Sequence, residues 1–144
     1  MIGIVVDSIT SDSHNYCMFR ELNKLSKTEQ CFVFTNTIQA LPMQNNFTIL
    51  QHIEALSHQG TLIATSLLNC QIVANSLTPK KKLFYLWGFD WMKFDSLNAP
   101  QLNVMLHNPE IELLARSESH KNLISKLFKE PKAIVYNWRS DELM

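Results

Sequence analysis

The residues best suited to chemistry stand directly after short apolar runs. Asp7 follows the run at residues 2–6, and Arg116 follows the run at residues 111–115. Carboxylate, hydroxyl and guanidinium groups at the ends of buried strands can bind a polar ligand. The candidate ligand-binding residues are Asp7, Ser8, Thr65, Ser66, Asp90, Arg116 and Ser117. Arg116, with a helix start at Ser117, offers the best contact for an anion, although most such residues only cap helices and satisfy loops.

Missing motifs argue against several common kinds of site. Residues 7–15 contain no glycine, whereas a dinucleotide fold needs glycines there so that the backbone can approach the pyrophosphate. The chain has no GxxxxGK[ST] and no GxSxG motif, and Asp7 lacks the second acid and late lysine of a phosphatase or receiver site. The five histidines form no HxH or HExxH pair. We therefore expect no cofactor and no metal, and the sequence identifies no catalytic residue.

Apolar strand-like runs alternate with helix-like segments along the chain. Strands are expected at residues 2–8, 31–36, 47–51, 61–66, 81–92, 111–117 and 132–138. Helices are expected at residues 11–27, 52–60 (closed by Gly60), 67–77, within 96–109, and from a Ser117 cap to the stop at Pro131. This alternation predicts a Rossmann-like α/β fold, a three-layer sandwich with a mostly parallel sheet, as one domain over residues 1–144.

Helical spacing also predicts which side chains face the core. Ser11, Asp12 or Ser13 would cap the first helix. The expected apolar faces, helix by helix, are Met18, Phe19, Leu22 and Leu25; Leu67, Leu68, Ile72, Val73 and Leu77; and Leu123, Ile124, Leu127 and Phe128.

Composition favours a soluble protein without a nucleic-acid partner. Thirteen basic and thirteen acidic side chains cancel, whereas nucleic-acid binders cluster lysine and arginine. We expect the one basic run, Lys80–Lys82, to solubilise the entrance of a strand, with a functional basic patch as the alternative. The start, MIGIVVD, lacks the basic region of a signal peptide, and no apolar run reaches the roughly 20 residues of a membrane span, so we expect a cytoplasmic protein without membrane contact.

Three widely spaced cysteines indicate buried, reduced thiols. The twelve asparagines suggest an AT-rich genome such as that of a phage or marine microbe.

Three late segments carry a family resemblance. "LFYLWGFDWM" is a strand whose end carries Asp90, "LLARSESHKNLISKLF" passes through Ser117 into a helix, and "KAIVYNWRSDEL" follows with Asn137. In this order they resemble the N-terminal, acceptor-side half of a GT-B-type glycosyltransferase, in which the last strand leads into a "PNGVD"-like link. The resemblance covers most of the chain. Tyr136 and Trp138 replace the proline and glycine of that link, and the glycine-rich loop after the first strand is absent.

The resemblance implies a sugar or nucleotide-sugar ligand and a missing donor-binding half. On that basis the chain is expected to be a subunit or a relic of a glycosyltransferase and not a complete enzyme. A different hypothesis is a non-enzymatic homodimeric interaction module of the same fold, because tryptophan is enriched at interface hot spots. Its candidate contacts are Trp87, Trp91, Trp138 and Phe94. The aromatic segment at residues 84–91 also suits a platform for sugar rings, although core packing is the commoner role.

Overall fold

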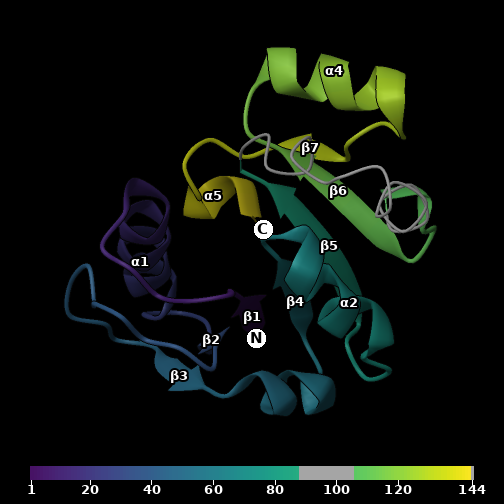
Figure 1. Ribbon diagram of the computed structural model, residues 1–144. Helices are drawn as coiled ribbons and strands as arrows, with labels where there is room; N and C mark the ends of the chain where they lie inside the picture. The colour runs from purple at the N-terminus through teal and green to yellow at the C-terminus, as the bar shows by residue number, and fades with distance from the viewer. Residues whose placement is uncertain (88–105, 144) are drawn as a thin grey trace.

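One parallel sheet runs through the part of the chain that the structure describes, residues 1–87 and 106–143 of a computed structural model (Figure 1). Its strands are β1 (Ile2–Val5), β2 (Cys31–Phe34), β3 (Thr48–Leu50), β4 (Thr61–Ala64), β5 (Lys81–Leu86), β6 (Ile111–Ala115) and β7 (Ala133–Ile134). They lie in the order β3-β2-β1-β4-β5-β6-β7, and every neighbouring pair is parallel.

The direction of chain progression reverses at β1. The chain passes outward through β2 and β3, then crosses back so that β4 pairs with the other side of β1. The register places Val5, the last residue of β1, beside Phe34 on one side and Ala64 on the other. The carboxyl ends of β1 and β4 are therefore level, and the segments that follow them diverge to opposite faces of the sheet. In open α/β sheets this is the place where ligands bind.

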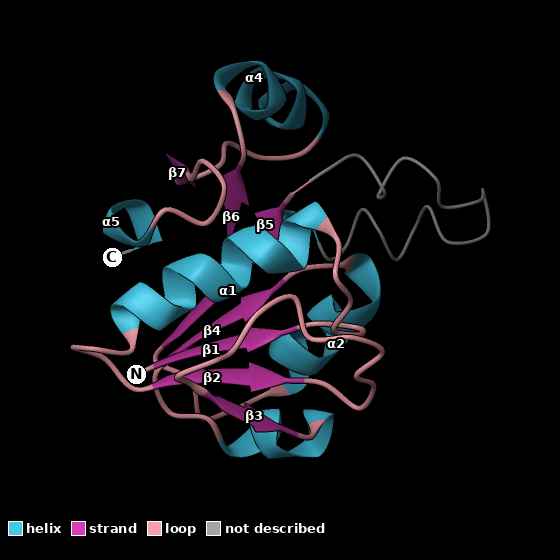
Figure 2. Cartoon of the chain, turned by 90° about the vertical axis from the view of Figure 1, so that its left-hand side faces the viewer, coloured by secondary structure: helices cyan, strands magenta, loops and turns pink. Residues whose placement is uncertain are grey.

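Helices cover both faces of the sheet, which gives the three layers that the sequence predicts. The helical elements are α1 (Ser13–Leu25), the 3₁₀ helix η1 (His52–Ser57), α2 (Leu67–Asn75), α4 (Glu118–Leu127) and α5 (Ser140–Leu143). In Figure 2, α1 crosses the near face of the sheet and α2 lies behind it. The four predicted apolar residues of α1 are all buried in the same core cluster as Val33 of β2, and Val73 of α2 packs in a second cluster with Phe84 of β5. The Rossmann-like α/β fold is confirmed.

Several predicted elements differ in extent. The helix predicted up to Gly60 is a 3₁₀ helix that ends at Ser57; the His58 N–H bonds to Ala55 and the chain then extends, and no described glycine has a positive φ. The strand predicted over residues 81–92 ends at Leu86, with residues 88–92 outside the described part. The strand predicted over residues 132–138 shrinks to two residues.

Two of the apolar residues assigned to α2 do not face the core. Leu68 is 68% exposed and Leu77, beyond the helix end, is 93% exposed. On α4, Ile124 is buried as expected, whereas Leu127 is half exposed. The helix expected within residues 96–109 lies mostly outside the described part of the chain.

The three cysteines are free: Cys31 and Cys70 are buried as predicted, whereas Cys17 is only half-buried. Burial raises the pKa of the Cys70 thiol to about 12. Within the described residues, no helix is long and apolar enough to span a membrane.

Candidate functional site

Four of the seven predicted site residues meet at the point where the sheet order reverses. Asp7 and Ser8 follow β1, Thr65 and Ser66 follow β4, and all four line a pocket of about 180 Å³. The start of α1 completes its wall. The lining residues are Val6, Asp7, Ser8, Thr10, Asp12, His14, Asn15, Thr65 and Ser66.

Asp7 presents one carboxylate oxygen to this pocket. Its Oδ1 accepts hydrogen bonds from Ser66 Oγ at 3.0 Å and from Asn69 Nδ2 at 3.1 Å. No described residue donates to its Oδ2, and the side chain is exposed. Oδ1 therefore fixes the orientation of the carboxylate, and Oδ2 is an acceptor that a ligand can reach.

The start of α2 holds this arrangement in place. Ser66 is the N-cap, accepting from the Asn69 N–H at 3.1 Å, while Asn69 Oδ1 accepts from the N–H groups of Thr65 at 2.9 Å and Ser66 at 3.2 Å. Thr65 Oγ1 donates to Val5 at 2.8 Å. The Thr65 hydroxyl thus bonds to the backbone, whereas Ser66 and Asn69 both cap the start of α2 and bond to the Asp7 carboxylate.

Asp12 is a second acid at the pocket, at the N-terminus of α1. Its Oδ1 accepts from the backbone N–H of Asn15 at 2.8 Å and from Asn15 Nδ2 at 3.0 Å. Burial tends to raise its pKa, but these hydrogen bonds, together with Thr10 and His14, bring the pKa below its ordinary value. Asp12 is therefore ionised at neutral pH.

The pocket's electrostatics disfavour a phosphate. Helix N-termini commonly bind anions, but here the Asp7 carboxylate already bonds to Ser66 and Asn69 at the start of α2. The lining residues include two acids and no lysine or arginine among the described residues. Hydroxyl groups, which both donate and accept, match this set of carboxylate and hydroxyl oxygens.

Arg116 and Ser117 lie at the end of β6 and do not line the pocket. The Arg116 guanidinium carbon sits 3.6 Å from the centroid of the Trp87 ring, and its Nε and Nη2 donate to Asn137 Oδ1 at 3.3 and 3.1 Å. Ser117 caps α4, accepting from the His120 N–H at 3.2 Å. Arg116 Nε and Nη2, two of the nitrogens predicted to contact an anion, thus already donate to a protein oxygen.

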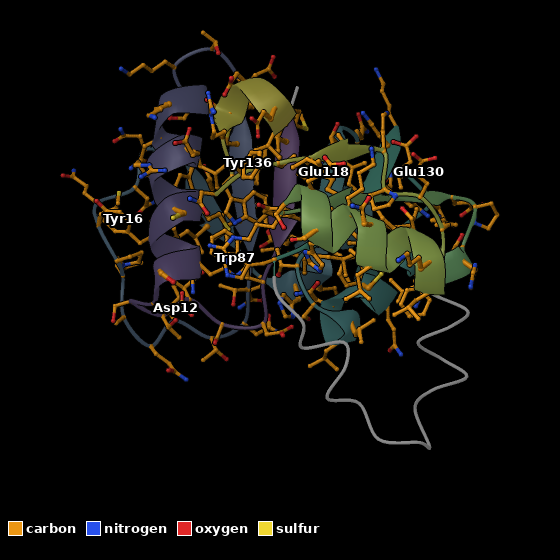
Figure 3. All side chains as sticks on the ribbon, turned by 90° about the horizontal axis from the view of Figure 1, so that it is seen from above. Asp12, Tyr16, Trp87, Glu118, Glu130 and Tyr136 are labelled. Carbon is orange, nitrogen blue, oxygen red and sulfur yellow. The ribbon has the colours of Figure 1, made fainter. Side chains whose placement is uncertain are left out.

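His14 connects these two regions. It lines the Asp7 pocket and stacks on Trp87, with ring centroids 4.5 Å apart and planes 13° apart. Figure 3 shows Trp87 between Asp12, at the start of α1, and Glu118 of α4. A substitution at Arg116 or Trp87 can therefore affect the pocket wall through the contact between Trp87 and His14.

The aromatic residues mostly build the core. Trp138 is 1% exposed, so the prediction that it forms an exposed interface is wrong: its ring packs edge-on against Tyr85 at 4.5 Å. Phe84 and Tyr85 are also buried, and the Tyr85 hydroxyl donates to Val135. Burial raises the pKa of Tyr85 to about 12. Trp87 contacts Arg116, which rules out an open sugar platform on that part of its ring.

Sequence reasoning missed His14, Asp12 and Asn69 as parts of the site. The spacing from Ser66 to Asn69 matches that of a capping box, which could have identified Asn69. His14 carried no local signal, because its role depends on Trp87, far along the chain. Asp90, Trp91 and Phe94 lie outside the described residues. Within the described part of the chain, no cluster of three His, Cys, Asp or Glu residues could hold a metal ion.

A larger cavity of about 350 Å³ lies at the amino ends of β5 and β6, beside Lys80–Lys82. Some of the charges around it are paired: Lys82 Nζ is 3.5 Å from Glu110 and donates to Ala74 at 3.0 Å, while the lining Glu112 is 2.8 Å from Lys132. The Lys82 side chain is only 10% exposed and is engaged within the protein, and the solubilising role expected for Lys80–Lys82 stays a prediction.

Comparison of the chain with protein-family models, with curated proteins and with solved structures gave no match.

Proposed function

We propose that this domain binds a sugar or a similar neutral polyol in the pocket formed by Asp7, Ser8, Thr65 and Ser66. The observation that carries the proposal is the Asp7 carboxylate, held through Oδ1 by Ser66 and Asn69 while Oδ2 has no described donor. A carboxylate oxygen beside hydroxyl groups accepts strong, charge-assisted hydrogen bonds from sugar hydroxyls.

The pocket's size supports a single sugar ring. Pockets for drug-sized ligands are roughly 300–1,000 Å³. The volume here is about 180 Å³, and both acids repel a phosphate. A neutral acceptor sugar therefore fits this domain better than a nucleotide sugar does.

The resemblance to the acceptor-side half of a GT-B glycosyltransferase agrees with this proposal. Trp138, at the position of the link's glycine, has a φ of 63°, the left-handed conformation that glycine adopts without strain. Asn137, at the position of the link's asparagine, has a φ of 49°. On this proposal the domain contributes acceptor binding, and glycosyl transfer needs a donor-binding half on this chain or another.

Isothermal titration with neutral monosaccharides, sugar phosphates and nucleotide sugars tests the proposal. We expect saturable binding of at least one neutral sugar, with its phosphate binding more weakly. Asp7→Asn keeps the shape of the side chain but removes its charge, and we expect it to weaken binding about tenfold, because hydrogen bonds to charged groups contribute about 1.5–3 kcal/mol. Asp141→Asn, the same change at an exposed residue of α5, is the control and should have no effect.

Three results would contradict the proposal. They are the absence of any neutral-sugar binding at tens of millimolar, preferential binding of a nucleotide sugar, and an Asp7→Asn variant that binds as tightly as the unaltered protein.

A further inference from the structure

A second cavity, of about 260 Å³, lies between η1 and the β2–β3 edge of the sheet. Its lining residues are Met1, Phe32, Phe34, Leu50, Glu54, Ser57, His58 and Gln59. The helix that covers this face of the sheet edge is short: η1 has six residues, of which only Ala55 is buried. Phe32 and Leu50 consequently stay half-buried on this face of the sheet.

Three aromatic rings form one corner of the cavity. Phe32 and Phe34 lie side by side on β2, with ring centroids 6.2 Å apart. His58 meets both edge-on, at 5.9 Å from Phe32 and 5.6 Å from Phe34. Gly3 makes room for this corner, because a Cβ there would lie 2.7 Å from Phe34 and 3.0 Å from His58. Such a corner suits the edge or face of another aromatic ring.

The hydrogen bonding of His58 identifies the polar group that the cavity offers. Nε2 lies 3.0 Å from the Thr61 carbonyl oxygen, which can only accept, so Nε2 carries the proton. Burial lowers the pKa of the imidazole, which keeps the ring neutral. Nδ1 is then an acceptor to which no described residue donates. This nitrogen keeps some access to solvent, although His58 as a whole is only 6% exposed.

Two other polar groups at the cavity already take part in hydrogen bonds within the protein. Glu54 accepts from the Gln51 N–H at 2.9 Å, and Ser57 Oγ donates to the Glu54 carbonyl at 3.0 Å. Together with the His58 Nδ1 acceptor and the apolar corner, this arrangement suits a ligand that carries a hydrogen-bond donor on an apolar ring.

We infer that this cavity binds a small aromatic alcohol, with its ring against Phe32 and Phe34 and its hydroxyl donating to His58 Nδ1. The inference is independent of the proposed sugar site, which lies at the carboxyl ends of β1 and β4. A ligand that covers Nδ1 without donating to it removes this acceptor from water without a replacement hydrogen bond, which is costly, so the site discriminates between ligands by the hydroxyl and not only by ring size.

Phenol and anisole test the inference on the unaltered protein, because anisole keeps the ring but cannot donate. We expect phenol to bind about fivefold more tightly than anisole, as one net hydrogen bond implies, and to shift the ¹⁵N resonance of His58 Nδ1. Equal affinities, an unmoved Nδ1 resonance, or no saturable binding of phenol would overturn the inference.

His58→Gln provides the matched variant. Glutamine can still donate to the Thr61 carbonyl but has no acceptor at the Nδ1 position. We expect the phenol–anisole difference to disappear in this variant, because the loss of the imidazole ring from the corner weakens the binding of both compounds equally. A persisting preference for phenol would assign the discrimination to another group and refute the role of His58.

Discussion

Two consecutive residues with left-handed backbone follow the last strand, and neither is glycine. Asn137 and Trp138 have φ values of 49° and 63°. Asparagine tolerates this region better than most residues, and its side chain holds Arg116 in place. Trp138 is kept there by burial beside Tyr85. Core packing thus imposes the turn that ends β7 after two residues.

Asn137→Ala and Asn137→Gly separate the backbone from the side chain at this turn. Both lose the acceptor for Arg116, but alanine also bears the steric penalty of a left-handed residue, about 1–2 kcal/mol. We expect the alanine variant to be about 1 kcal/mol less stable than the glycine variant in urea unfolding. Equal free energies of unfolding for the two variants would show that the backbone at residue 137 leaves the left-handed conformation without loss of stability.

At the scale of elements, α1 depends on its cap. Asp12 accepts from the Asn15 N–H at 2.8 Å, and α1 provides much of the core on its face of the sheet. Replacing such a cap by alanine costs about 1 kcal/mol. We expect Asp12→Ala to lower the free energy of unfolding by about that amount, and Asp12→Ser, which retains a capping oxygen, to lose less than half of it. Chemical denaturation followed by circular dichroism measures both; a serine variant as unstable as the alanine variant would contradict the capping role.

Elements with strong local signals could be predicted from the sequence. Continuous apolar runs identified β1, β2, β4 and β6, and Ser117 caps α4 as predicted. η1 was mistaken for an ordinary helix, because the difference lies in hydrogen bonds and not in composition. For the site, strand ends led to Asp7 and Ser66. The contact between His14 and Trp87 could not be foreseen, since it requires knowing which strand lies next to which.

At the scale of the whole molecule, Glu21 joins the two ends of the chain. Its Oε2 accepts from the Ser140 N–H, 119 residues away, at 3.2 Å, while Oε1 contacts Lys24 at 3.0 Å and Arg20 at 3.1 Å. The residue is 3% exposed. Burial tends to raise its pKa, but the bonds to Lys24, Ser140 and Arg20 outweigh burial and lower the pKa.

This lowered pKa predicts an acid-sensitive contribution to stability. A carboxyl whose pKa is lower in the folded state stabilises the fold above the unfolded-state pKa, about 4.3, and loses that effect as the pH falls through the folded-state value. We expect Glu21→Gln to lower the free energy of unfolding by about 1.5 kcal/mol at pH 7 and to flatten its pH dependence below pH 4.

Glu130→Gln is the control for this prediction. The Glu130 side chain is 77% exposed, and its ion pair with Lys121 is long, at 3.9 Å. The substitution should change stability by less than about 0.5 kcal/mol at any pH. Parallel pH profiles for the Glu21 variant and the unaltered protein would rule out the tie between α1 and α5 as the origin of the effect.

The central place of β1 has a consequence for synthesis on the ribosome. The first strand to emerge must wait for both of its neighbours, and the second of these, β4, ends at Ala64. At about 5–20 residues per second, that delay is roughly 3–12 s. During this time a nascent segment of apolar residues, with both edges open, is a target for chaperones and for aggregation. Translation speed through the codons for β1 to β4 should therefore affect the yield of folded protein more than speed through the codons for β5 to β7.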